Sequence, residues 1–287
     1  MPLTDKYINP LTDFGFKKIF GTETNKDLLI DFLNQLLPER HQIEDLVFDK
    51  NEHLANSEFD RIAIFDIFCQ SKKGEQFIVE IQRKRQKNFK ERSILYSTYP
   101  IHEYADKGKD YDFELPVIYT IALLDFTFED YENTPHLIHK VKLKDEQGKV
   151  FYDKLSYIYI ELPKFNKTID QLETHFDKWL FILKWLSKLQ KRPKALQERV
   201  FQKIFKLAEI AKYSKMERGQ YEQSLKHYRD LQNSLSFAKE EGKEEVLLKI
   251  IKNLIDNDFS LEQISKFTEV SVIELKKYVS EQGWNSK

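Results

Sequence analysis

The chain has 287 residues, of which 41% are hydrophobic and 32% charged, and its 46 Lys and Arg nearly balance its 47 Asp and Glu. This composition is typical of an ordered globular protein that is long enough for roughly one or two domains. A net charge of −1 excludes a global attraction to nucleic acid, so any such binding has to come from local patches. The single cysteine, Cys69, excludes an intramolecular disulfide and a zinc ribbon.

The sequence carries no sign of export or of membrane insertion. Residues 1–6 lack the pattern of a signal peptide, and no apolar run approaches the about 20 residues of a membrane span. We therefore expect a cytoplasmic protein. Cys69 falls in a predicted strand, where it is expected to be a small buried hydrophobe.

In chain order, the first part of the sequence predicts an α/β core. Apolar spacing and turn residues predict helices over 13–20, 25–37 and 89–105, and strands over 43–51, 61–70, 76–82, 116–125, 150–152 and 157–161. Pro100 is expected to kink or interrupt the third helix. The continuous apolar run 116–125 is typical of a strand buried on both faces.

After Pro163 the sequence becomes helical. Segments 170–190 and 194–250 are rich in Lys, Glu, Gln and Leu and contain few helix breakers. An apolar stripe there is expected to face the core or a partner helix rather than a ligand site; it consists of Trp179, Leu180, Leu183, Leu186 and Leu189. The domain boundaries that we expect are an α/β core over 1–165, a helical extension over 166–243 and a small helical tail over 244–287.

The tail contains two capping-box signatures, in which a serine precedes Gln or Glu by three residues. They predict helices over 261–267 and 272–281, which with a helix over 244–256 resemble a helix-turn-helix. The second of these helices offers Lys276 and Lys277 but no Arg. Reading of DNA by this tail and a plain helical hairpin that packs or dimerises are both open at this point.

Residues 65–82 form the most informative stretch, because they predict a hairpin that carries three polar side chains. Apolar runs flank the polar turn 71–74, which is typical of two tightly joined strands. Side chains alternate along a strand, so Glu80 and Gln82 share one face, and Asp66 stands opposite Glu80 if the hairpin is symmetric. Two buried carboxylates are costly unless they are compensated, and a divalent cation is the usual compensation. The alternative is an exposed pair on a solvated face.

The spacing of Asp66, Glu80 and Gln82 resembles the metal-binding core of the PD-(D/E)XK nucleases, whose last position is normally Lys. The Gln form and its surroundings resemble the PD-(D/E)XK nuclease-family transposases, also called recombination-promoting nucleases. The other segments that carry the resemblance are Asp13–Phe20, Leu28–Asn34, Arg92, Tyr96, Gly108–Tyr111 and Pro116–Ile118. The resemblance implies a restriction-endonuclease-like fold, with a central mixed sheet flanked by helices and a mostly helical C-terminal region.

The resemblance also implies a DNA endonuclease that depends on Mg²⁺ (or Mn²⁺) and promotes recombination or mobilisation. Mg²⁺ prefers oxygen ligands, so Asp66 and Glu80 are expected to hold the ion, with the Ile81 carbonyl as a further ligand. Gln82 can orient the attacking water but supplies no positive charge. This leaves the electropositive role open.

Residues elsewhere are candidates for completing the site. Lys84 or Lys90 is a candidate replacement for the missing lysine. An acidic group from the first helical region is also expected, and the candidates are Glu23, Asp27 and Asp31.

A basic run directly follows Gln82 and is predicted to bind DNA; it comprises Arg83, Lys84, Arg85, Lys87, Lys90 and Arg92. Beside a metal site such a run fits a track for the phosphate backbone, although alone it would indicate a solvated face. Arg92 and Tyr96 lie four residues apart on one helix face. They are expected either to steady the scissile phosphate or to anchor their helix to the sheet.

A rival interpretation keeps the fold without catalysis, as a DNA-binding or protein-interaction module. Gln82 and the long helical C-terminal half favour it, and dependence on metal distinguishes the two. The seven His residues show no zinc-binding spacing, and the segment 136–139 is expected to be a polar loop. Without a glycine-rich phosphate loop, nucleotide binding is not expected. DNA is the predicted partner, and the C-terminal helices are candidates for forming a homo-oligomer.

Overall fold

The computed structural model describes residues 5–49, 65–86, 88–107, 114–257 and 259–284. The chain forms two compact units, Met1–Tyr228 and Arg229–Lys287. Among the described helices, none is both long enough and apolar enough to cross a bilayer.

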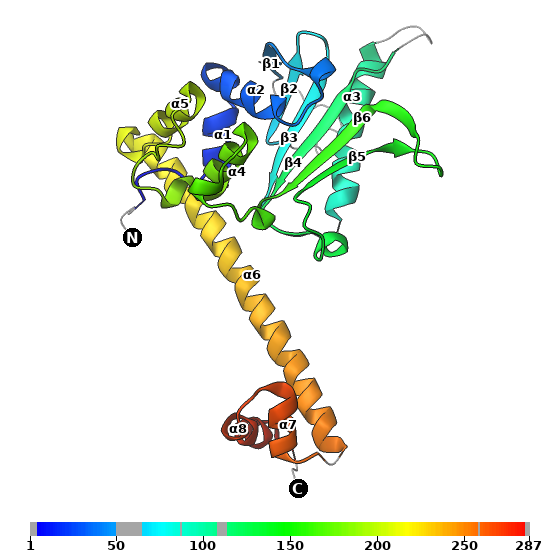
Figure 1. Cartoon of the computed structure of the whole chain (residues 1–287), viewed down its shortest axis with the longest axis vertical. Coiled ribbons are helices and arrows are strands. Elements are labelled where there is room, and N and C mark those ends of the chain that lie inside the picture. The colour runs from blue at the N-terminus through cyan, green and yellow to red at the C-terminus, as the bar shows by residue number, and fades with distance from the viewer. Residues whose placement is uncertain (1–4, 50–64, 87, 108–113, 258, 285–287) are drawn as a thin grey trace. The chain divides into compact units, whose positions relative to one another are not determined.

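A six-stranded mixed sheet forms the centre of the first unit, with the strand order β1-β2-β3-β4-β6-β5 (Figure 1). The strands are β1 (Leu46–Phe48), β2 (Ile67–Ser71), β3 (Gln76–Gln82), β4 (Ile118–Leu124), β5 (Ile138–Lys144) and β6 (Val150–Glu161). β1, β2 and β3 pair antiparallel, β3, β4 and β6 pair parallel, and β5 pairs antiparallel with β6. Every residue of β4 is buried, as the apolar run predicts for a strand covered on both faces.

Helices cover both faces of this sheet. They are α1 (Asp13–Phe20), α2 (Lys26–Asn34), α3 (Phe89–Lys107), α4 (His175–Trp185), α5 (Arg199–Leu207) and the first part of α6 (Lys215–Asp256). Alternate residues of β3 show the two layers: Phe77 and Val79 join the main core with α1, α2, α4 and α5, whereas Ile78 packs with Tyr96 of α3. The expected α/β class, with a mostly helical C-terminal region, is confirmed.

The apolar stripe of the helical region packs where it was expected. Trp179 is completely buried, and its ring contacts those of Phe20, Phe32 and Phe201. The helices that follow the sheet in sequence thus share one core with α1 and α2. This packing holds α1 against the sheet and fixes which of its side chains face the end of β3.

Two local expectations are wrong, and a third is answered in part. α3 runs through Pro100, so the helix is not interrupted there, and a kink at Pro100 stays a prediction. The two short strands expected over 150–152 and 157–161 are one strand, β6. The expected loop over 136–139 instead runs into β5 from Ile138 onward, because that segment pairs with β6 along its length.

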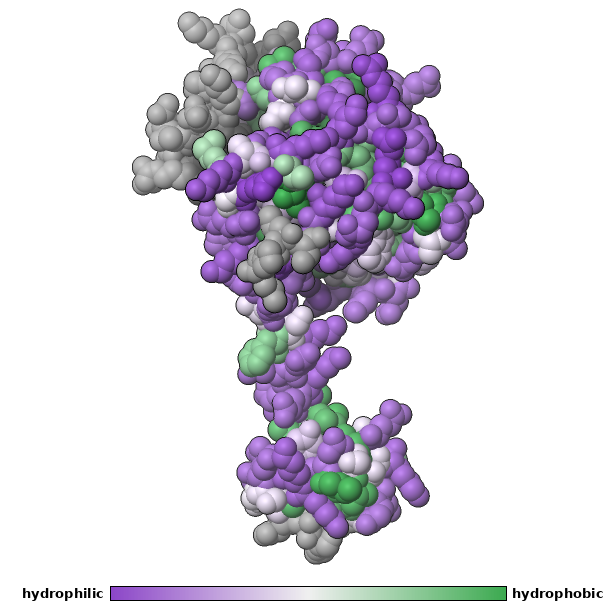
Figure 2. Space-filling view, turned by 90° about the vertical axis from the view of Figure 1, so that its left-hand side faces the viewer, coloured by the Kyte–Doolittle hydropathy of each residue, from purple (hydrophilic) through white to green (hydrophobic). Residues whose placement is uncertain are grey.

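The second unit contains the end of α6 together with α7 (Leu261–Thr268) and α8 (Val272–Gln282). Both expected capping boxes are present, at Ser260 and Ser271. Its small core consists of Ile251, Ile255, Ile264 and Leu275. The helix expected over 244–256 is the last part of α6. Figure 2 shows hydrophobic atoms among the hydrophilic surface of this unit, where Phe267 and Ile273 are exposed.

Candidate active site

The hairpin of β2 and β3 has the register that its sequence predicts. Ile67 pairs with Val79 across the two strands, so Asp66 stands opposite Glu80. The turn is tight because Gly74 adopts φ 84°, a left-handed conformation that glycine accepts readily. Cys69, inside β2, is buried and free, in agreement with a small hydrophobe, and burial raises the pKa of its thiol.

Two hydrogen bonds connect the acidic residues of this hairpin. The main-chain N–H of Asp66 donates to Glu80 Oε1 at 3.2 Å, and the main-chain N–H of Ile81 donates to Asp66 Oδ2 at 2.8 Å. Each carboxylate is therefore oriented by the backbone of the other strand. The two groups converge at one end of the sheet.

Glu80 is buried and Asp66 is half-buried. Glu80 is only 7% exposed, and burial raises its pKa to about 8, with a further contribution from the charge of Asp66. Burial also raises the pKa of Asp66, which the hydrogen bond from Ile81 opposes. Among the described residues, neither group forms an ion pair with Lys, Arg or His. These observations exclude the alternative of an exposed pair on a solvated face, and they leave two like charges that need a cation when both are ionised.

Charged side chains from three elements surround the pair. Lys17 of α1 lowers the pKa of both carboxyl groups, whereas Asp13 of α1 raises that of Asp66. Arg83, just after β3, lowers the pKa of Asp66, and Arg92 of α3 lowers that of Glu80. The end of β3 is thus flanked by positive charge from both faces of the sheet.

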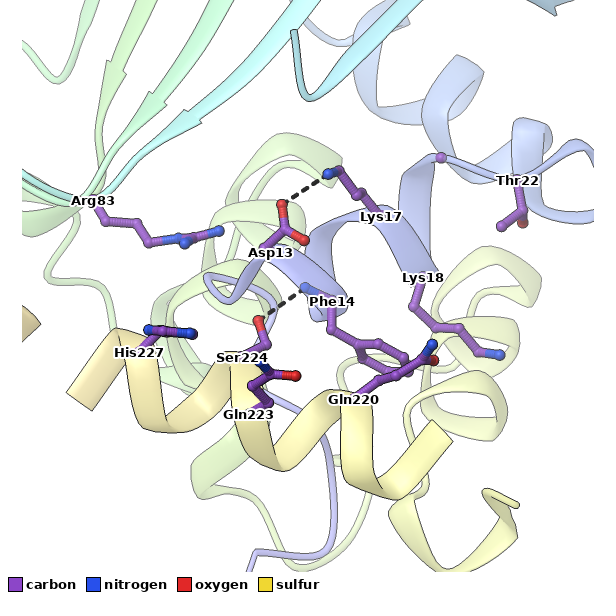
Figure 3. A pocket seen from close by; sticks show the side chains of 11 residues that line it. Asp13, Phe14, Lys17, Lys18, Thr22, Arg83, Gln220, Gln223, Ser224 and His227 are labelled. Carbon is purple, nitrogen blue, oxygen red and sulfur yellow. Dashed lines mark hydrogen bonds and ion pairs between the residues drawn. The ribbon is translucent and has the colours of Figure 1, made fainter. Parts of the chain in front are cut away.

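A pocket of about 680 Å³ lies beside this end of β3, between α1 and the first part of α6 (Figure 3). Its lining residues are Asp13, Phe14, Lys17, Lys18, Gly21, Thr22, Arg83, Gln220, Gln223, Ser224 and His227. The Asp13 carboxylate and the Lys17 ammonium form an ion pair at 2.9 Å, and Arg83 extends toward them from the sheet. None of the candidate metal ligands lines this pocket; Arg83, directly after Gln82, connects it to the end of β3.

Gln82 is buried at the third motif position. Its side-chain amide donates to the carbonyl of Lys84 at 2.7 Å, and its own main-chain carbonyl accepts from the N–H of Asp125 at 3.0 Å. The amide is therefore engaged with the backbone just beyond β3. Its predicted role in orienting water stays a prediction.

The basic run after β3 is divided among different partners. Arg83 donates from Nε to the carbonyl of Leu11 at 2.8 Å, and Lys84 is exposed. Arg85 pairs with Glu129 and Lys90 with Asp130.

Arg92, at the end of the run, donates to the hydroxyl of Tyr96 at 2.5 Å. Lys87 lies outside the described residues, as does the segment Gly108–Tyr111. DNA binding by the run stays a prediction.

The three acidic residues expected from the first helical region have other partners. The Glu23 carboxylate lies 3.8 Å from the Lys26 ammonium, and Asp27 pairs with Lys203. The Asp31 carboxylate accepts hydrogen bonds from His175 and Trp179. The acid that the structure brings toward Asp66 is Asp13, which was not among those candidates. The segment Asp13–Phe20 carries part of the family resemblance, but the orientation of its helix depends on packing that the sequence does not show.

The donor set fits a hard cation such as Mg²⁺. Mg²⁺ is commonly bound through one or two carboxylates together with waters and substrate phosphates. Asp66 and Glu80 supply those two carboxylates on neighbouring strands. Within the described part of the chain, no cluster of three or more His, Cys, Asp or Glu side chains is arranged to hold a metal ion.

A mixed sheet with an antiparallel hairpin, acidic residues facing each other across it and helices on both faces together define the class of PD-(D/E)XK nucleases. The family model for the PD-(D/E)XK nuclease family transposases matches residues 10–238. The chain belongs to this family, and the expected restriction-endonuclease-like fold is confirmed. No curated protein and no solved structure matches the chain.

Proposed function

We propose that the protein is a DNA endonuclease that depends on Mg²⁺ (or Mn²⁺) and promotes DNA recombination or mobilisation. The observation that carries this proposal is the Asp66–Glu80 pair. A buried carboxylate (Glu80) beside a half-buried one (Asp66), each oriented by the backbone of the other strand and without a cationic partner among the described residues, contributes little to the stability of the fold. Such a pair is well suited to bind a divalent cation. Membership of the nuclease family supports DNA as the substrate.

The roles of the chain's own residues follow from their placement. Asp66 and Glu80 hold the ion, and the Ile81 carbonyl between the two polar positions of β3 is the third protein ligand. The bound ion supplies Lewis-acid stabilisation of the phosphate and a more acidic water. Gln82 orients that water once its amide leaves the Lys84 carbonyl. The positive charges of Arg83 and Arg92 attract the phosphate backbone to this end of the sheet.

The first test is cleavage of supercoiled plasmid in Mg²⁺, Mn²⁺ or EDTA, with the parent protein and the variants Asp66→Ala and Asp66→Asn. We expect metal-dependent nicking by the parent and none above background by either variant. Asp153→Asn is the matched control, because Asp153 is an exposed carboxylate of the same sheet that pairs with Arg40. Equal cleavage by parent and Asp66 variants would place the activity elsewhere or in a contaminant.

The rival function is a DNA-binding or protein-interaction module without catalysis. The bond between the Gln82 amide and the Lys84 carbonyl favours it, because that amide is not directed at a water in this conformation. Such a module binds DNA equally well in EDTA and in Mg²⁺, and it tolerates Asp66→Ala. DNA binding measured by fluorescence anisotropy with and without metal separates the two functions.

We assign the nuclease core to 1–165, a helical extension to 166–243 and the helix-turn-helix-like tail to 244–287. The tail serves dimerisation, target choice or both, and the protein acts in the cytoplasm. Light scattering of the full chain and of a chain ending at residue 243 tests whether the tail controls the oligomeric state.

A further inference from the structure

Hydrolysis of a phosphodiester needs positive charge where negative charge develops on the phosphate. Gln82 cannot supply it, and the two lysines suggested by the sequence are poorly placed. Lys84 is exposed beyond the end of β3. Lys90 pairs with Asp130, and its ammonium lies 5.1 Å from the ring centre of Phe128. Among the described residues, Arg83 and Arg92 are held by the Leu11 carbonyl and the Tyr96 hydroxyl, and Lys17 of α1 remains as a further source of this charge.

Lys17 of α1 is placed to provide that charge. Its ammonium is held by Asp13, one helical turn earlier, at 2.9 Å. The helix itself is fixed, because Phe16 and Phe20 are completely buried and the Thr12 hydroxyl caps its first turn by accepting from the N–H of Gly15 at 3.0 Å. Lys17 lines the pocket together with Arg83, which directly follows Gln82 in the sequence.

The pocket beside Lys17 has the chemistry of an anion site. Lys17, Lys18 and Arg83 line it with three positive charges, and Asp13 is the one carboxylate among its described lining residues. Lys18 pairs with Glu217 at 2.6 Å, outside the lining. Arg83 is anchored through its Nε to the Leu11 carbonyl, which orients its guanidinium toward the pocket. From α6, Gln220 and Gln223 add amide groups that can donate to phosphate oxygens.

We propose that this pocket receives the phosphate backbone of bound DNA and that Lys17 supplies the positive charge which Gln82 lacks. The inference rests on the proposed nuclease function and adds a residue and a binding surface to it. Asp13 acts as a positioning residue, because its carboxylate holds the Lys17 ammonium at 2.9 Å in the pocket beside the end of β3. DNA thus approaches along α1 and the first part of α6 as well as along the basic run.

The reaction balances without a further reactant. The oxygen of water forms a bond to phosphorus while the bond from phosphorus to the departing oxygen breaks. One proton of the water ends on the departing oxygen, and the other is released by the new phosphate monoester. Lys17 stays protonated throughout and stabilises the charge that gathers on the phosphate oxygens.

The test compares Lys17→Met and Lys17→Arg with Lys84→Met and Lys90→Met in the full chain. Single-turnover cleavage of a short duplex is measured in Mg²⁺, and binding of the same duplex is measured in Ca²⁺ at several salt concentrations. Lys226→Met is the control, because Lys226 is an exposed lysine of α6 that does not line the pocket. Lys17 is itself 48% exposed in its side chain, so its replacement is compatible with folding.

We expect Lys17→Met to lower the cleavage rate by about 10²-fold or more, as the loss of a charge-stabilising donor does. The slope of log affinity against log salt should fall by about one, because one phosphate contact is lost. Lys17→Arg should recover much of both, whereas Lys226→Met should change neither. Affinity for Mg²⁺ should be unchanged or slightly higher, since Lys17 repels the cation; a purely structural role for Lys17 would instead weaken metal binding.

The outcomes separate the inference from the proposed function. If the parent cleaves and Lys17→Met cleaves equally well, the inference is wrong and the nuclease stands. Loss of cleavage in Lys84→Met or Lys90→Met alone would also overturn it. If the parent does not cleave, the proposed function is wrong, and the proposed DNA contact at the pocket is tested by binding alone. A smaller salt slope in Lys17→Met supports that contact, and an unchanged slope overturns it.

Discussion

The main-chain N–H of Asp66 donates a hydrogen bond to the carboxylate of Glu80 at 3.2 Å, so the residue that begins the hairpin orients the acid on the opposite strand. Such an arrangement is unfavourable when both groups are ionised and no cation is bound, because Glu80 is buried beside a like charge. The metal-free protein is therefore less stable than it would be without these two charges, but its site for a cation is already formed.

We predict that Glu80→Gln stabilises the metal-free protein, and more so at alkaline pH. Glu80 has a usual pKa of 4.5, which burial and the charge of Asp66 raise to about 8, against Arg92 and Lys17. Below pH ~4.5 the acid is protonated in both the folded and the unfolded protein, so it does not destabilise the fold. As pH rises from ~4.5 toward ~8, the unfolded protein loses this proton first, and the free energy of unfolding falls. Gln keeps the acceptor for Asp66 and cannot ionise.

Urea unfolding in EDTA at pH 5 and pH 9 checks this prediction. The variant should gain a few kcal/mol over the parent at pH 9, on the order of 2–4 kcal/mol, and little at pH 5. An equal gain at both pH values would show that packing rather than ionisation is responsible.

Binding of Mg²⁺ should strengthen with pH between about 6 and 9. The ion needs the Glu80 carboxylate, whose pKa of about 8 leaves most of it protonated at neutral pH, so a proton has to be released. Calorimetry in two buffers of different ionisation enthalpy measures that release, with an expected increase of up to about tenfold in affinity per pH unit. Asp66→Asn should abolish binding at every pH, and a flat profile for the parent would contradict the assignment of Glu80 as a ligand.

The hairpin could be predicted from sequence because its information is local. The alternation of apolar residues sets the faces, and the turn sets the register that brings Asp66 opposite Glu80. The two capping boxes at Ser260 and Ser271 were found for the same reason, since each involves residues only three apart. Local signals of this kind depend little on the rest of the fold.

Features that depend on distant partners were missed. The segment Ile138–Lys144 becomes a strand because it pairs with β6, and its own sequence had suggested a polar loop at its start. Asp13 and Lys17 reach the site because Phe16 and Phe20 pack α1 onto a core that includes Trp179, far away in sequence. No spacing rule within the first helix shows which of its faces meets the end of β3.

Asp31 should prove to be structural. Its carboxylate accepts hydrogen bonds from Trp179 Nε1 at 2.7 Å and from His175 Nε2 at 2.6 Å, and the Trp179 side chain is completely buried. Asp31→Ala leaves that indole N–H without its acceptor, which should cost about 1–3 kcal/mol in the free energy of unfolding. Asp31→Asn retains an oxygen acceptor and should cost less. Affinity for Mg²⁺, measured in the same samples, should match the parent; a loss would place Asp31 in the site.

Neutralising the acids that pair with the basic run should strengthen DNA binding. Glu129 pairs with Arg85 and Asp130 with Lys90, so the double variant Glu129→Gln/Asp130→Asn releases two cations. The slope of log affinity against log salt should then become steeper, by an amount that corresponds to up to about two additional phosphate contacts. Glu240→Gln/Glu241→Gln, which makes the same change in net charge at exposed positions of α6, is the control. Equal effects of the two double variants would mean that only net charge matters.

Arg92 and Tyr96 can be assigned to substrate or to structure by separate substitutions. The Arg92 guanidinium donates to the Tyr96 hydroxyl at 2.5 Å, its carbon lies 5.3 Å from the ring centre, and its charge lowers the pKa of Glu80. Tyr96→Phe removes the hydrogen bond but retains the charge and the buried ring, so it should cost about 1 kcal/mol of stability and leave most of the cleavage activity.

Arg92→Gln removes the charge, so the pKa of Glu80 should rise and the pH dependence of Mg²⁺ binding should move to higher pH. Single-turnover cleavage of a duplex by parent and Arg92→Gln, compared at the pH where each protein's rate reaches its alkaline plateau, then isolates the contact with the phosphate. A plateau rate below that of the parent assigns Arg92 to the substrate, and a rate equal to that of the parent assigns it to the anchoring of α3.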